Sequence, residues 1–135
     1  MAVKQKKLAF ILCFLLLLSG CGRKKPEISH NVVSRAEVVC TQGEQTYQLT
    51  YRHPKKLEAI LNFLRTLRDQ GRPEISPEQL GGDRFDIRLT MPDGTVRTHR
   101  LQDYAYFCRS GGEWEKIDPI QGRSFMVLLK LMPED

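Results

Sequence analysis

Apolar and polar residues alternate most regularly between residues 84 and 91. The apolar positions are Phe85, Ile87, Leu89 and Met91. This period of two predicts a strand with one buried and one solvated face. Asp93 and Gly94 follow, a pair that favours a two-residue hairpin turn, so residues 96–101 are expected to return as the next strand.

Further strands are indicated on both sides of this hairpin. Residues 37–40 and 45–52 are expected to pair around the turn at 41–44, because Tyr47, Leu49 and Tyr51 alternate with polar neighbours. Residues 104–109 and 113–117 are expected to pair around the turn Ser110-Gly111-Gly112.

Two segments carry apolar residues at helical spacing. The first is residues 55–70, whose apolar stripe is Leu57, Ile60, Leu61, Leu64 and Leu67. Gly71 and Pro73 are expected to end it. The second is residues 119–131, capped by Asp118, with the stripe Phe125, Leu128, Leu129 and Met132. A brief helical turn is also expected at 77–79, after the capping residue Ser76.

The predicted order is therefore ββα followed by ββββα. Four strands in succession predict an antiparallel meander, and a sheet with polar alternation needs cover on one face only. The predicted fold class is α+β, a two-layer sandwich with an antiparallel sheet and two helices on one face. Composition agrees with one globular domain over residues 32–135, since 41% of the chain is hydrophobic and 27% is charged.

The first twenty residues have the pattern of an export signal. Three lysines (Lys4, Lys6 and Lys7) precede the apolar run at residues 8–18 and the small residues Ser19 and Gly20. As a helix this run would span about 16 Å, against about 30 Å for a bilayer core, so a permanent transmembrane helix is the weaker interpretation.

Leu18-Ser19-Gly20-Cys21 resembles the lipobox of bacterial lipoproteins at all four positions. The resemblance implies cleavage by signal peptidase II, a diacylglycerol-modified Cys21 and a domain held on the extracytoplasmic side of a cell membrane. Two fatty acyl chains are needed for a durable anchor. Residues 1–20 would then be the signal peptide and residues 21–31 a short tether. The alternative is an ordinary secretory signal with a chance cysteine.

The formal charge of +5 is concentrated near the start of the chain. From Val32 onward there are 15 basic and 15 acidic side chains, so the domain is neutral, and it carries no nucleic-acid motif. No nucleic-acid partner is therefore expected. Arg23, Lys24 and Lys25 would lie next to the bilayer, where they contact anionic headgroups or simply begin a solvated linker.

If Cys13 is removed with the leader and Cys21 is lipidated, Cys40 and Cys108 are the two cysteines left in the folded domain. Disulfides persist in exported proteins, so these cysteines, 68 residues apart, are candidates for a bond. The alternative is two buried thiols that act as small hydrophobic residues. His30, His53 and His99 have no ligand spacing, so neither a metal site nor a cofactor is expected.

The hairpin turn at Asp93-Gly94 would place Arg88 opposite His99. One candidate contact face then consists of Arg84, Asp86, Arg88, Arg97 and His99. It would suit an acidic envelope polymer or a protein partner, or it is a solvated face that only pairs across strands. Trp114 is a candidate aromatic contact, although core packing is the more common role of such a ring.

Three functions are compatible with these patterns. The first is a non-enzymatic binding module of the cell envelope, favoured because recognisable catalytic motifs are absent from the sequence. The second is a small envelope hydrolase with His99 and Asp86 as its catalytic pair. The third is an immunity or inhibitor lipoprotein that blocks a secreted toxin or hydrolase.

Overall fold

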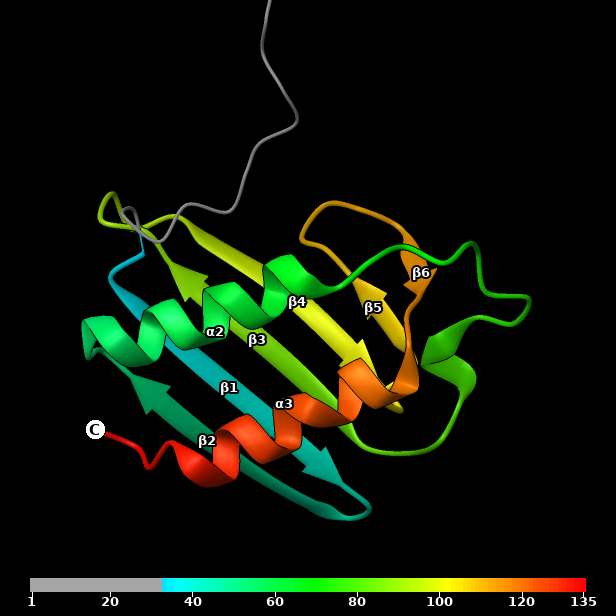
Figure 1. Ribbon diagram of the computed structural model, residues 1–135, viewed down its shortest axis with the longest axis horizontal. Helices are drawn as coiled ribbons and strands as arrows, with labels where there is room; N and C mark the ends of the chain where they lie inside the picture. Colours follow the sequence, from blue (N-terminus) through cyan, green and yellow to red (C-terminus); the bar gives the residue numbers. More distant parts are fainter. Residues whose placement is uncertain (1–32) are drawn as a thin grey trace, which may run out of the picture.

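The computed structural model describes residues 33–135, which form a six-stranded antiparallel sheet with both long helices on one face (Figure 1). The strands are β1 (Arg35–Gln42), β2 (Gln45–Tyr51), β3 (Arg84–Thr90), β4 (Val96–Gln102), β5 (Tyr106–Cys108) and β6 (Trp114–Lys116). The helices are α2 (Pro54–Thr66), the 3-10 turn η2 (Pro77–Gln79) and α3 (Pro119–Leu131). The predicted α+β sandwich and its element order are confirmed.

The strand order across the sheet is β2-β1-β3-β4-β5-β6. β1 and β2 form a hairpin, and α2 carries the chain over the sheet so that β3 pairs with the other side of β1. β3 to β6 then follow one another as the predicted meander. The outermost strands are β2 on one side and β6 on the other.

The core lies between the sheet and the two helices. Phe125 of α3 joins the two layers, since its ring stacks on Phe63 of α2 at 4.7 Å and meets Phe85 of β3 edge-on at 5.4 Å. The hydroxyl of Tyr51 donates to the carbonyl of Met132 at 3.0 Å and fixes the end of α3 to β2. This helix-covered side of the sheet is called the core face below, and the other side the open face.

Helix α2 ends at Thr66, four residues before the predicted end. The predicted apolar stripe is confirmed as far as Leu67, which is buried, but Leu67 has extended backbone angles. The chain then turns to the sheet: Gln70 N–H donates to the carbonyl of Lys116, and Lys116 N–H donates to that of Gly71, both at 2.8 Å. Pairing with β6 therefore replaces the last helical turn.

The β3–β4 hairpin differs by one residue from the predicted register. Its loop has three residues, 92–94, because Met91 N–H donates to the Thr95 carbonyl at 2.8 Å and Gly94 N–H donates to the Met91 carbonyl at 3.0 Å. Gly94 takes a φ of +89°, which fits a three-residue loop that ends in a left-handed residue. Because side chains alternate with a period of two, this shift moves every β4 side chain to the face opposite the predicted one.

Candidate binding surface

The open face of the sheet is built by alternate residues of the strands. On β3 it receives Arg84, Asp86 and Arg88, while Phe85, Ile87 and Leu89 enter the core. In the observed register, Asp86 faces Arg100 and Arg88 faces Thr98. The open face therefore includes Arg100, which a two-residue turn would have placed on the core face.

The predicted five-residue contact face is wrong in its β4 half. Arg97 pairs with Leu89 and His99 with Ile87, which places both β4 residues on the core face. Arg84, Asp86 and Arg88 stay together on the open face. The proposed catalytic pair of His99 and Asp86 is also wrong, since the two side chains project from opposite sides of the sheet.

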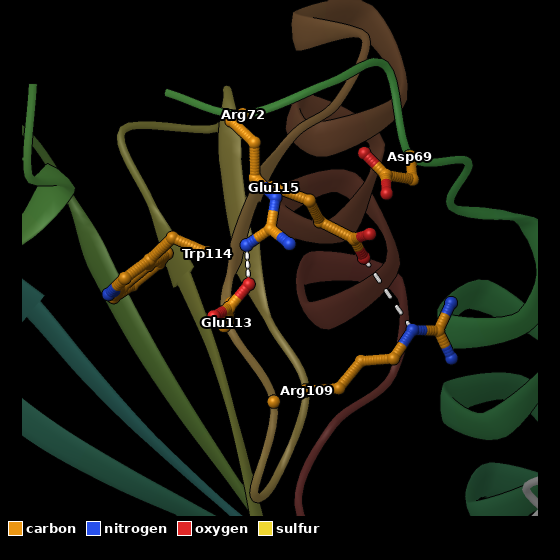
Figure 2. A pocket seen from close by; sticks show the side chains of 7 residues that line it. Asp69, Arg72, Arg109, Glu113, Trp114 and Glu115 are labelled. Atoms are coloured by element: carbon orange, nitrogen blue, oxygen red, sulfur yellow. Dashed lines mark ion pairs between the residues drawn. The ribbon is translucent and has the colours of Figure 1, made fainter. Parts of the chain in front are cut away.

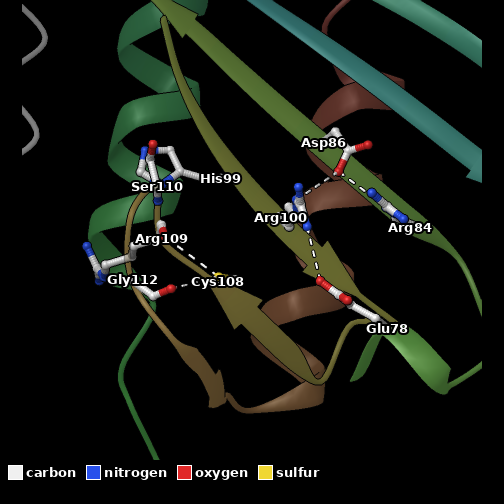
Figure 3. Close-up of polar contacts among 9 residues, drawn as sticks. All are labelled: Glu78, Arg84, Asp86, His99, Arg100, Cys108, Arg109, Ser110 and Gly112. Atoms are coloured by element: carbon white, nitrogen blue, oxygen red, sulfur yellow. Dashed lines mark hydrogen bonds and ion pairs between the residues drawn. The ribbon is translucent and has the colours of Figure 1, made fainter. Parts of the chain in front are cut away.

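Asp86 is the centre of an ion-pair cluster on the open face (Figure 3). Its Oδ1 lies 3.3 Å from Nε of Arg84 and 3.9 Å from Nε of Arg100. The guanidinium of Arg100 also contacts Glu78 of η2 at 3.2 Å. The amide of Gln102 donates to the carbonyls of the loop at residues 80–81, so the η2 segment covers this end of the open face.

The strand residues of the open face, taken together, have an excess of positive charge. The five strand residues that carry it are Arg35, Arg84, Arg88, Arg100 and Lys116, against the acidic Glu37 and Asp86. Glu37 faces Arg88 across the β1–β3 pair, but its carboxylate contacts Arg35 at 2.9 Å and accepts from the Gln48 amide at 3.1 Å. Arg88 is exposed and has no ion-pair partner within residues 33–135.

His99 is 4% exposed on the core face, and its contacts indicate a structural role. Its Nδ1 accepts from the backbone N–H of Ser110 at 3.1 Å (Figure 3), and its ring stacks on Phe107 at 5.9 Å. Burial, with the charges of Arg109 and Arg97, lowers its pKa to about 4. A neutral imidazole that holds the β5–β6 turn is what this geometry supports.

A hollow of about 200 Å³ lies beside β6 on the core face of the sheet (Figure 2). The side chains around it are Asp69, Arg72, Arg109, Glu113, Trp114 and Glu115. Arg72 forms an ion pair with Glu113, and Arg109 lies 3.5 Å from Glu115 while its guanidinium covers the ring of Phe107 at 5.5 Å. Burial and nearby Asp69 raise the pKa of Glu115. The two arginines that line the hollow, Arg72 and Arg109, are thus already paired with acids.

Trp114 is half-buried and does not join the core cluster. It faces Cys108 across the β5–β6 pair, on the open face, and Figure 2 shows its ring directed away from Glu115. The expectation that core packing takes up this ring is therefore wrong. Trp114 stays available as an aromatic contact at the β6 end of the open face.

The predicted bond between Cys40 and Cys108 is wrong, since both cysteines are free. Cys40 is buried on the core face opposite Phe85, whereas Cys108 faces Arg100 on the open face. β3 and β4 lie between their strands, a separation of about 14 Å that no disulfide spans. Burial raises the pKa of both thiols, so neither is an activated nucleophile.

Within residues 33–135, no group of three or more histidine, cysteine or acidic side chains is arranged to hold a metal ion. No helix in the same part of the chain is long and apolar enough to cross a membrane. Cys21, the predicted lipobox and the predicted tether lie outside the described residues. Comparisons with protein-family models, with curated proteins and with solved structures found no match to this chain.

Proposed function

We propose that this protein is a lipid-anchored, extracytoplasmic binding module, and that the open face of its sheet contacts another component of the cell envelope. The sequence of the leader supports the anchor, through the resemblance of residues 18–21 to a lipobox. The single observation that carries the binding role is the arginine-rich sheet face, which no helix covers apart from the η2 segment at one end, with unpaired Arg88 near its middle.

The chemistry of this face favours an acidic partner. Arginine presents a planar fork of donors that fits carboxylate and phosphate groups. Arg88 is exposed and forms no ion pair in the described chain, because the facing Glu37 contacts Arg35 and Gln48 instead, so its donors are free to meet such a group. An acidic envelope polymer or an acidic patch on an envelope protein, including a secreted toxin or hydrolase that this protein blocks, has the required charge.

The anchor is tested by metabolic labelling with a fatty-acid probe. Labelled parent protein and an unlabelled Cys21→Ser variant are expected. Equal labelling of the two proteins would remove the basis for placing the domain at a membrane.

The binding face is tested by photo-crosslinking in intact cells of the native host. A photoreactive amino acid replaces Arg88 on the open face in one variant and Arg97 on the core face in a matched control, since both arginines are exposed strand residues. Specific products from position 88 and their absence from position 97 support the proposal. Products of the same identity from both positions, or from neither, contradict it.

A further inference from the structure

The two edges of the sheet are protected differently. The outer side of β6 is bonded to Gln70 and Gly71, and β6 is only three residues long. β2 has seven residues, QTYQLTY, without a charge or a proline. Proteins usually protect an exposed edge with lysine, proline, bulges or a covering segment. β2 contains neither lysine nor proline, and other segments of the described chain cover it only in part.

The hydrogen-bonding groups that β2 turns outward can be identified from its register. The hairpin closes with Gln42 opposite Gln45, and bonded pairs alternate with non-bonded pairs from there. The backbone groups of Thr46, Gln48 and Thr50 therefore point away from β1. The N–H of Thr50 donates to the side chain of Glu134 at 2.9 Å, which confirms this direction. The N–H groups of Thr46 and Gln48 have no partner within the described chain.

A groove runs beside this open part of β2, on the core face. It has a volume of about 300 Å³ and lies between the strand and α3. Its lining residues are Gln42, Tyr47, Leu49, Met126, Leu129 and Lys130. Tyr47 and Leu49 alternate with the residues whose backbone groups are free, so a strand added to this edge would direct every second side chain into the groove.

The charge at the groove indicates the chemistry of its occupant. Lys130 is the one charged residue among those that line it. Helix α3 carries Arg123 and Lys130 but no acidic residue. The side chains of Val127 and Leu131 on α3 are also exposed, with exposed fractions of 56% and 78%. A second copy of this chain would bring its own Lys130 to the same edge, and the acidic Glu134 at that edge is already bonded to the Thr50 N–H, which argues against self-pairing.

We propose that β2 accepts an extended segment of a partner protein as a seventh strand. Apolar side chains at alternate positions of the segment enter the groove, and a carboxylate meets Lys130. Backbone bonds to Thr46 and Gln48 supply affinity, and the groove supplies selectivity, as in other cases of strand addition. This site is separate from the open face and does not depend on the anchor or on what the open face binds.

The test uses the full chain in detergent micelles and two fluorescent seven-residue peptides. Both alternate valine with threonine, and the central valine is replaced by glutamate in one and by lysine in the other. Fluorescence anisotropy is expected to show tighter binding of the glutamate peptide. Lys130→Glu is expected to reverse this preference, with a change of about tenfold for each peptide.

Proline substitution at the edge separates strand addition from simple apolar contact. Gln48→Pro removes an outward N–H that the sheet does not use, and Gln48→Ala keeps it as the matched control. Gln48→Pro is expected to weaken the glutamate peptide by about fivefold to tenfold, and Gln48→Ala to change it little. Circular dichroism checks that both variants keep the fold.

Three outcomes would overturn the proposal. They are equal affinity of the glutamate and lysine peptides, unchanged binding by Gln48→Pro, and no binding of either peptide at millimolar concentration. Sedimentation of the same samples tests for a fourth outcome that would overturn the proposal. A dimer that Gln48→Pro dissociates would assign the edge to a second copy of the chain instead.

Discussion

His99 lies directly opposite Ile87 across the β3–β4 pair, one residue away from the position opposite Arg88 that a two-residue turn would give it. The imidazole is therefore inside the core, where it packs on Phe107 and accepts from Ser110 N–H. An ionisable group at this position makes the stability of the domain depend on pH.

We expect acidification from pH 7 to pH 5 to destabilise the domain through His99. The group has a pKa of about 4 when folded and an ordinary value of 6.5 when unfolded, so the unfolded chain binds the proton first. The neutral form contributes its full stability above pH 6.5, and that contribution is lost as the pH falls toward 4. The loss is about 2 kcal/mol at pH 5 and about 3 kcal/mol once the pH is below 4.

Urea unfolding at a series of pH values measures this loss. His99→Gln can keep an acceptor for Ser110 but does not titrate, so its stability is expected to change less between pH 7 and pH 5 than that of the parent. NMR titration of the His99 ring gives the pKa directly. A value near 6.5 in the folded protein would show that burial does not disfavour the imidazolium.

Much of the fold could be predicted because its signals are local. The alternation around Ile87 and the capping of α3 by Asp118 depend on neighbouring residues, and both strand and helix were found. The end of α2 depends on Lys116, nearly fifty residues later, which no local pattern reveals. The prediction of the contact face was wrong because of the turn length. Asp93-Gly94 suits turns of two and of three residues, and the difference of one residue in the turn decides which side of the sheet His99 occupies.

Replacement of Gly94 tests the three-residue turn. At φ +89° a Cβ is strained although nothing lies within 4 Å, so Gly94→Ala is expected to lower the free energy of unfolding by about 1–2 kcal/mol. Gly81 also has open space around it but no positive φ, and Gly81→Ala serves as the control with little change. Similar denaturant midpoints for the two variants would contradict the observed turn geometry.

The cysteines are expected to be free thiols in the protein purified without reductant. After unfolding in denaturant, alkylation and peptide mapping should find one label on Cys40 and one on Cys108. In the folded state Cys108 should react first, because Cys40 is fully buried while Cys108 is only half-buried. Recovery of a linked peptide that joins both residues would contradict the sheet register, because the register puts them on opposite faces.

Gly122 is expected to reverse the usual rule for glycine in a helix. In a solvated helix interior, alanine is about 1 kcal/mol better than glycine. At Gly122 of α3, however, a Cβ would lie 1.8 Å from the carbonyl oxygen of Tyr104, whose backbone is held at a φ of +59°. That oxygen belongs to the backbone and cannot rotate away, so α3 would have to move off the sheet. Gly122→Ala should therefore lower the free energy of unfolding by about 2 kcal/mol or more. Ser124→Ala, an exposed position in the same helix, should change it little in the same urea titration. A stabilised Gly122→Ala variant would mean that α3 does not make this close approach to the backbone of Tyr104.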